Sequence, residues 1–197
     1  MKINLTVRGV TPLIINRFTD EDAQGATNGS RSSSAARDRG QPQDDARNRL
    51  YVGLDGTTPI VPVVNMFQCV ISGGQFFKIG KKQITTQRSS LVPACVTVLG
   101  KDEGVELPIM HEQDWKVDTR PVRIPATGGR ILRHRPMFDD WKLELAIDLD
   151  EEWNENLMRD IVDAAGKKIG LCDYRPQCRG PYGKFVVDSW ECSNGTG

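Results

Sequence analysis

Residues 170–185 hold the residue types best suited to bind a nucleic-acid backbone. Three glycines there permit a positive φ and leave backbone N–H groups uncovered, as a loop that cradles phosphate requires. Basic side chains supply charge, and two tyrosines offer ring faces for stacking on a base or gripping a ribose. An ordinary glycine-rich connection whose tyrosines plug the core fits this composition equally well. The residues predicted to contact the backbone are Tyr174, Arg175, Arg179, Gly180, Tyr182 and Lys184.

A second run of positive charge lies in residues 119–136, which contain five arginines and no acid. In residues 139–163 the balance reverses, with ten Asp or Glu against two Lys or Arg. Because residues two apart on a strand share a face, Arg133 and Arg135 are predicted to project together with Ile131. Such a face is either a solvated outer surface or a phosphate-binding one, and the absence of acids favours phosphate binding. The predicted contacts are Arg120, Arg123, Arg130, Arg133 and Arg135.

Catalytic chemistry has weaker support in the sequence. The two histidines, His111 and His134, lie in no Ser–His–Asp order and no metal-ligand spacing. Aspartates within residues 17–49 offer acids for phosphodiester cleavage, but the simpler interpretation is that they keep a polar segment soluble. We therefore expect no metal and no cofactor, and we favour a binding protein over an enzyme. The aspartates concerned are Asp20, Asp22, Asp44 and Asp45.

The composition is that of one ordinary globular domain. The 197 residues carry 26 basic and 26 acidic side chains, so the net charge of zero argues against a surface coated in phosphate-binding charge and conceals the local imbalance. Five cysteines without a CxxC pair predict reduced thiols rather than disulfides or a zinc site. No apolar run approaches the ~20 residues that cross a bilayer. We expect a cytoplasmic protein with no membrane contact.

Hydrophobic periodicity predicts strands interspersed with two helices. Strict alternation in residues 141–149 predicts the clearest strand. A helix is expected from Val63 or Asn65 to Gly73, and another from an Asp150 N-cap to a stop at Gly166. Further strands are expected at residues 2–8, 91–99 and 184–190, and a helix continuation or basic loop at 76–82. Residues 120–149, which end in the strand at 141–149, are expected to form one long hairpin.

Residues 17–49 differ from the rest of the chain. Phe18 is their only large apolar group, so they bury too little to offset the entropy of ordering, and we expect a flexible excursion. Strands with two helices indicate an α+β fold with one antiparallel sheet and helices on one face.

Three segments, spread along the chain in order, resemble the RAMP superfamily of CRISPR-associated proteins. Residues 9–15, GVTPLII, are similar to its first strand and Thr-Pro-Leu turn, and residues 59–66, PIVPVVNM, to its proline-led entry into the first helix. The glycine-rich loop followed by GPYGKFVV at residues 180–187 is similar to its C-terminal motif. The resemblance implies a ferredoxin-like, RRM-type domain over residues 1–197 with an extra hairpin, in which residues 17–49 are a thumb-like insertion.

The resemblance also implies a function. Backbone subunits of CRISPR effector complexes polymerise along guide RNA, so the expected partners are single-stranded RNA or DNA, copies of this chain in a helical or filament-like assembly, and other CRISPR-type subunits. Some members carry a target-cleaving aspartate where residues 17–49 lie. The helix entry departs from the family, because Val64 to Gln68 replace its usual Ser-Ser-Leu-Lys-Gly and a lysine expected near RNA is missing.

That departure fits a divergent, stand-alone or virus-encoded relative. Two other functions therefore stay open: a protein-interaction module or mimic that kept the fold and acts on a CRISPR complex without nucleic acid, and a metal-dependent endoribonuclease.

Overall fold

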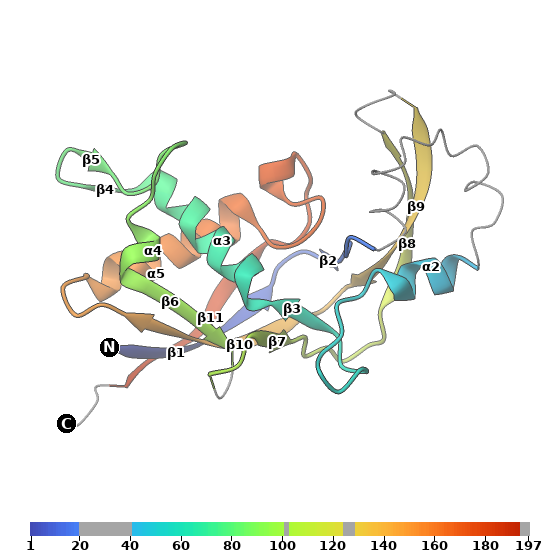
Figure 1. Ribbon diagram of the computed structural model, residues 1–197, viewed down its shortest axis with the longest axis horizontal. Helices are drawn as coiled ribbons and strands as arrows, with labels where there is room; N and C mark the ends of the chain where they lie inside the picture. Colours follow the sequence, from blue (N-terminus) through green and yellow to red (C-terminus); the bar gives the residue numbers. More distant parts are fainter. Residues whose placement is uncertain (20–40, 101–102, 124–128, 194–197) are drawn as a thin grey trace.

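The computed structural model describes residues 1–19, 41–100, 103–123 and 129–193 (Figure 1). Its base is a four-stranded antiparallel sheet in the order β11-β1-β10-β6. Helix α3 (Val63–Gly73) connects the first two of these strands in the chain, and α5 (Glu155–Ala164) connects the last two. This βαββαβ succession, with the last strand beside the first, is the ferredoxin-like arrangement, so the predicted fold class is confirmed. The strands are β1 (Lys2–Gly9), β6 (Val96–Gly100), β10 (Lys142–Leu149) and β11 (Phe185–Ser193).

The alternation that predicted the strands decides which face of the sheet is buried. Ile3, Leu5 and Val7 of β1 are buried beneath the helices, whereas Asn4 between them is exposed. Leu5 lies opposite Leu145 of β10, so the apolar residues of neighbouring strands form one continuous layer. Removing a leucine from such a layer typically costs 2–5 kcal/mol, because the cavity it leaves closes only in part.

The two helices lie side by side on this layer. Met66 and Val70 of α3 and Met158 and Ile161 of α5 are all fully buried. The contact is so close that a Cβ added at Gly73 would lie 2.7 Å from the Ile161 carbonyl oxygen. The predicted start of this helix at Val63 and its end at Gly73 are confirmed, and a 3-10 turn (Gly74–Phe76) follows.

Both predicted ends of α5 were wrong. Asn154, not Asp150, is the N-cap, and its side chain accepts a hydrogen bond from the Leu157 N–H at 3.0 Å. Asp150 accepts from the Glu152 N–H in a preceding turn instead. At the other end a π-helical turn (Ala165–Ile169) continues through Gly166 to Gly170. Gly166 is required for a different reason, since a Cβ there would meet the Phe185 carbonyl oxygen at 2.3 Å.

A second, three-stranded sheet rises beside the first (Figure 1). It consists of the hairpin β8 (Lys116–Arg123) and β9 (Arg130–Phe138), with β2 (Leu13–Ile14) on the other edge of β9. The predicted pairing of these two strands is confirmed, but the inclusion of residues 141–149 in the same hairpin was wrong, because β10 pairs with β1 and β6 in the first sheet. Helix α2 (Pro42–Asn48) packs against β8 and β9 with Ala46 buried. The expected flexibility was therefore wrong for the end of the 17–49 segment, because α2 has an apolar contact to bury. Residues 20–40 lie outside the described part of the chain.

The remaining elements are short. β3 (Ile60–Pro62) pairs with β7 (Glu106–Pro108), and β4 (Lys78–Ile79) forms a tight hairpin with β5 (Lys82–Gln83) where a helix continuation or a loop was expected. The strand predicted at 91–99 is a strand only from Val96, because α4 (Val92–Cys95) occupies its first half. None of the helices in the described residues is both long enough and apolar enough to span a membrane.

Candidate nucleic-acid interface

The glycine-rich loop is fixed at both ends to the Thr-Pro-Leu segment. The Gly183 N–H donates to the Pro12 carbonyl at 2.8 Å, and the Asp173 N–H donates to the Ile14 carbonyl at 2.9 Å. The loop also closes on itself, since the Leu171 N–H donates to the Gly183 carbonyl at 2.9 Å. Two segments that are far apart in the sequence thus form one rigid structure, which lies between α3 and the β8–β9 hairpin.

The three loop glycines are needed for two different reasons. Gly170 and Gly183 have φ values of +76° and +68°, as predicted from their freedom to adopt the left-handed region. Gly180 does not have a positive φ, and its N–H donates to the Arg175 carbonyl at 2.9 Å. A Cβ at Gly180 would lie 1.8 Å from the Tyr174 carbonyl oxygen. Its role is to let two backbone segments meet, and its N–H is not uncovered.

Arg135 is neutralised inside the protein. Its side chain is 5% exposed, and its Nη2 and Nη1 lie 2.7 Å and 2.8 Å from carboxylate oxygens of Asp118 and Asp173. Asp118 also pairs with Arg120 Nε at 2.7 Å, and Arg120 hydrogen-bonds the Tyr182 hydroxyl and stacks 4.8 Å from the centre of its ring. The two acids lie just outside the acid-free run and far along the chain, so the arginine stripe is less positive than its sequence indicated.

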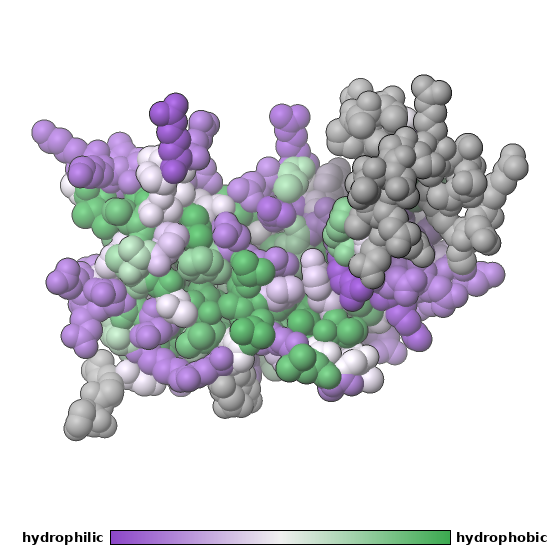
Figure 2. All heavy atoms as spheres, viewed as in Figure 1, coloured by the Kyte–Doolittle hydropathy of each residue, from purple (hydrophilic) through white to green (hydrophobic). Residues whose placement is uncertain are grey.

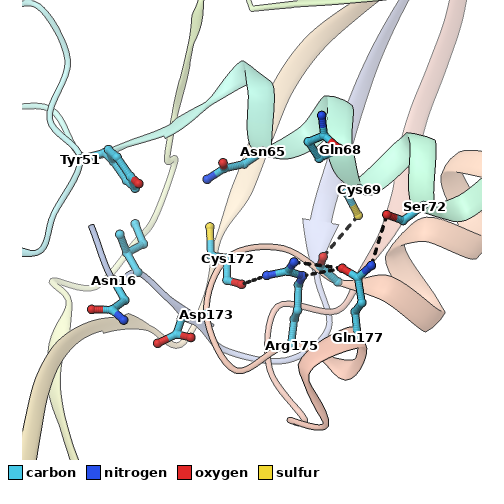
Figure 3. A pocket seen from close by; sticks show the side chains of 12 residues that line it. Asn16, Tyr51, Asn65, Gln68, Cys69, Ser72, Cys172, Asp173, Arg175 and Gln177 are labelled. Atoms are coloured by element: carbon cyan, nitrogen blue, oxygen red, sulfur yellow. Dashed lines mark hydrogen bonds between the residues drawn. The ribbon is translucent and has the colours of Figure 1, made fainter. Parts of the chain in front are cut away.

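Arg175 differs from both of these arginines, because its acceptors are uncharged (Figure 3). Nη1 donates to the Cys172 carbonyl at 2.7 Å, and Nε and Nη2 donate to Oε1 of Gln177 at 3.2 and 2.9 Å. Gln177 in turn donates to the Ser72 hydroxyl of α3 at 3.3 Å. Within the described residues no carboxylate forms an ion pair with Arg175. The guanidinium is thus held in place while its charge is left uncompensated.

The other predicted residues are dispersed around the loop. Tyr174 is 39% exposed and its ring centre lies 6.0 Å from that of Tyr182. Arg179 is exposed at a left-handed backbone position, and Arg130 is exposed at the start of β9. Lys184 is half-buried, and its backbone N–H donates to the Thr11 hydroxyl. Arg133 lines the cavity between the loop and the hairpin, and the Arg123 side chain lies outside the described residues.

Two adjoining cavities flank the loop. The first, about 470 Å³, lies between the loop and α3, and the second, about 540 Å³, lies between the loop and the β8–β9 hairpin. Asn16 and Asp173 line both, so the two form one cleft. Its lining includes Asn65, Gln68, Ser72, Arg175 and Gln177 in the first cavity and Arg120, Ile131, Arg133, Arg135, Tyr174 and Cys178 in the second.

Several of these lining residues were not predicted. Asn65, Gln68 and Ser72 recur at intervals of three and four residues, which places them on one face of α3. A polar stripe on an otherwise apolar helix is the sequence signal that would have found them. Asn16 and Gln177 carry no such pattern, because the fold alone brings them to the cleft.

The cleft contains no residues set up for nucleophilic or metal chemistry among those the structure describes. Burial raises the pKa of the Cys69 and Cys172 thiols to about 12, so both stay protonated and unreactive at neutral pH. His134 contacts Thr119, and His111 contacts the Gln113 carbonyl. No group of three or more His, Cys, Asp or Glu in these residues has the arrangement of a metal site.

The aspartates considered as acids are not in the cleft's lining. Asp45 pairs with Arg49 at 3.4 Å within and just after α2, and Asp44 is exposed on the same helix. Asp20 and Asp22 lie outside the described residues.

Comparison with known proteins bears on the fold. No family model and no curated protein matches the sequence. A chain of the type III-B Cmr-β structure bound to cognate target RNA superposes with a TM-score of 0.55 and 11% identity, over 96% of this chain and 59% of that one. The chain therefore shares the fold of that Cmr-β chain. A chain of a type IV-B CRISPR complex is similar at a TM-score of 0.48 and 9% identity, over 100% of this chain and 93% of that one.

Three short segments implied a CRISPR-type fold, and the likeness to the Cmr-β chain extends over 96% of this chain. This chain spans only 59% of the length of the Cmr-β chain it matches. At 11% identity the likeness concerns the fold, and the chemistry of the cleft has to be argued from its own residues.

Proposed function

We propose that this chain is a CRISPR-type subunit that binds a single-stranded nucleic acid, guide RNA in the first instance, in the cleft beside the glycine-rich loop. The observation that carries the proposal is the placement of Arg175 in the lining of a polar cleft, as a fixed cation that forms no ion pair with a carboxylate of the described residues. The Cmr-β structure with the same fold is bound to target RNA, which agrees with this ligand class.

Because the Arg175 guanidinium is already held in place, phosphate binding there costs little side-chain entropy. An arginine side chain carries about 2 kcal/mol of rotamer entropy, most of which is lost when it binds a ligand from a mobile state. Gln177 and the Cys172 carbonyl hold the Arg175 side chain in place before any ligand arrives. A charge-assisted hydrogen bond to phosphate therefore forms without that loss.

The neutralised arginines have a supporting role in this proposal. Asp118 holds Arg120, and Arg120 holds the Tyr182 ring by a hydrogen bond and by stacking. Arg135 ties the hairpin to the loop through Asp173. Tyr174, exposed beside Tyr182, is then positioned to stack on a base, a contact worth about 1–3 kcal/mol per base.

RRM domains bind RNA on aromatic residues of the outer face of their sheet. The corresponding face of this protein is poorly suited to bind RNA. In the described residues its outward positions on β1 and β10 contain no aromatic side chain, as Lys2, Asn4, Thr6 and Arg8 alternate with the buried set. Carboxylates are spread across it and would repel phosphate. They are Glu144, Asp148, Asp188 and Glu191.

The side-by-side assembly of copies along one strand is part of the proposal. It rests on the RAMP-like fold and on the cleft being open at the molecular surface, which lets a strand continue to a neighbouring copy. Mass measurement by light scattering, with and without a long oligonucleotide, tests it: a stepwise increase in mass is expected, and a fixed one-to-one complex would contradict it.

The binding claim is tested by fluorescence anisotropy with labelled oligouridylate across a salt series. We expect the log of the affinity to fall linearly with log salt, by about 0.7 for each phosphate neutralised on a single strand. Arg175→Ala should weaken binding and reduce the slope by about 0.7, whereas Lys142→Ala, on the outer face of the sheet, should change neither. Absent binding, or affinity indifferent to salt, would reject the function.

A protein-interaction module remains the second candidate because of one observation. An apolar cavity of about 470 Å³ opens beside the start of α3 and β6, lined by Val63, Val64, Phe67, Val98 and Val105 among others. Figure 2 shows hydrophobic residues gathered across the middle of this face. If the wild-type protein binds protein partners but no oligonucleotide, this candidate replaces the first.

A further inference from the structure

We propose that the β4–β5 hairpin is a second nucleic-acid-contacting surface that extends the cleft, so that the protein holds a strand longer than the cleft around Arg175. The proposal rests on the proposed function and adds to it a set of residues, a direction for the strand and a longer footprint. The hairpin plays no part in the chemistry described so far.

The hairpin belongs to a long stretch of the chain that has basic residues and no acidic ones. Residues 56–101 contain no Asp or Glu. Lys78, Lys81 and Lys82 are all exposed at the hairpin, and in the part of the chain that the structure describes none of them forms an ion pair. Figure 2 shows hydrophilic side chains projecting from the corner where Figure 1 places β4 and β5.

A second segment adds charge and an aromatic ring to the same corner. Lys168, from the π-helical turn after α5, places its Nζ 4.3 Å from the centre of the Phe76 ring. Lys167 beside it is exposed, and Phe76 itself is 42% exposed just before β4. An exposed aromatic ring among lysines is the composition of a platform on which bases of a single strand stack.

The base of the hairpin is continuous with the cleft. A third cavity, of about 420 Å³, lies between them and shares Ser72 and Gln177 with the cavity that contains Arg175. The path from the hairpin to Tyr174 is therefore one groove across three cavities. The rest of the third cavity is lined by Gln75, Gln83, Thr85, Thr86 and Gln87.

The lining of this third cavity suits a polyanion. All of its residues are neutral amides or hydroxyls, so nothing there repels phosphate, and amides offer both donors and acceptors to base edges and ribose hydroxyls. The wall is also firm. The Gln83 side chain donates to the Gln75 carbonyl, the Ile84 N–H donates to the Phe77 carbonyl at 3.1 Å, and Ile84 is 1% exposed.

The hairpin keeps its shape when its lysines are changed. Gly80 supplies the positive φ, +60°, that the two-residue turn needs, and the lysine side chains lie outside the packed core. A triple Lys78→Ala/Lys81→Ala/Lys82→Ala variant is therefore expected to fold. Its matched control is Lys2→Ala/Arg8→Ala/Lys142→Ala, which removes the same charge from the outer face of the sheet.

The experiment measures anisotropy of labelled oligouridylates of about 4 and about 16 nucleotides, the range that single-strand-binding domains cover. For the long oligonucleotide the hairpin variant should lose at least tenfold in affinity, and its salt slope should shrink by about 2, or about 0.7 for each of three phosphates. The short oligonucleotide should bind it like the wild type. The control variant should match the wild type for both lengths.

The outcomes separate this inference from the proposed function. If the wild type binds neither oligonucleotide, the proposed function fails and the inference fails with it. If Arg175→Ala weakens binding as expected but the hairpin variant equals the control for both lengths, the function stands and the extension is overturned. An equal loss for both lengths would also overturn it, because the lysines would then act at the Arg175 cleft itself. Retained RNA affinity with lost binding to polyaspartate would assign the lysines to an acidic protein instead.

Discussion

Replacing Asp118 with Asn tests whether Arg135 supports the structure or binds ligand. The substitution keeps the shape of the side chain and removes its charge, so Arg135, 5% exposed, loses one of its two carboxylate partners. Breaking a buried ion pair by removing one partner typically costs 3–5 kcal/mol, since a buried charge is left uncompensated. Asp173 still pairs with Arg135 at 2.8 Å and is 31% exposed, so we expect the low end, about 3 kcal/mol.

A double variant separates the cost of an orphaned charge from that of lost packing. In Asp118→Leu/Arg135→Met neither buried charge remains, and Arg120, 39% exposed, is left where water can solvate it. The double variant should therefore be less destabilised than Asp118→Asn, as replacing a buried pair by apolar residues is often neutral. Urea unfolding at pH 7, followed by tryptophan fluorescence, gives the free energies from the midpoint and slope.

Nucleic-acid binding supplies the decisive readout for this pair. Asp118→Asn makes the cleft more positive, so if Arg135 contacts phosphate, the affinity for oligouridylate should rise. We expect a loss of stability with affinity unchanged or reduced, because the Asp118 carboxylate also holds Arg120 against Tyr182. A stability change below about 0.5 kcal/mol together with tighter binding would refute the structural role assigned to Arg135.

Three further predictions concern the loop and its thiols. Gly180→Ala should lower the oligonucleotide affinity at least tenfold, because the new Cβ would lie 1.8 Å from the Tyr174 carbonyl oxygen. The control Gly56→Ala, whose Cβ meets nothing within 4 Å, should leave the affinity unchanged. Equal affinities of the two variants would show that binding does not depend on the loop conformation. Cys178, exposed and in the lining of the cleft, should be alkylated by iodoacetamide more slowly when oligouridylate is bound, as mass spectrometry of the peptide would show, and an unchanged rate would place the strand elsewhere. Burial raises the pKa of the Cys69 thiol to about 12 from an ordinary value near 9. The contribution of this neutral thiol to the free energy of unfolding is therefore complete below about pH 9 and is lost as the pH rises towards 12. Cys69→Ala should show a shallower decline of the urea midpoint between pH 8 and pH 11, and a decline identical to that of the wild type would contradict the raised pKa of Cys69.

The elements with strong local patterns could be predicted from the sequence. The apolar spacing and the glycine pair predicted α3 to within two residues at its start, and strict alternation predicted β10. The start of α5 was predicted wrongly at Asp150, because a local capping pattern does not show which of several polar residues begins the helix. Tertiary contact decides between them: the Asp150 N–H donates to the Cys95 carbonyl at 2.9 Å, which holds Asp150 at the sheet and delays the helix.

The composition of the cleft lining could be predicted in part, but its charge could not. Of the predicted contact residues, five line the cleft (Arg120, Arg133, Arg135, Tyr174 and Arg175), whereas Arg130, Arg179, Gly180, Tyr182 and Lys184 are not among its lining residues. The pairing of Arg135 depends on Asp173, 38 residues away, and on Asp118 directly opposite it across the hairpin, so a search of the local sequence found no acid. The predicted helix end at Gly166 was wrong for the same reason, because a local capping rule does not show that Phe185 packs against this glycine.

The most direct test of the central claim, a single strand lying in the cleft beside the glycine-rich loop, is photocrosslinking with an oligonucleotide that contains 4-thiouridine. Mass spectrometry of the cross-linked peptides then locates the strand on the protein. We expect cross-links within residues 170–184 and 116–135, centred on Tyr174 and Tyr182. Cross-links confined to β1 and β10, on the outer face of the sheet, would contradict it.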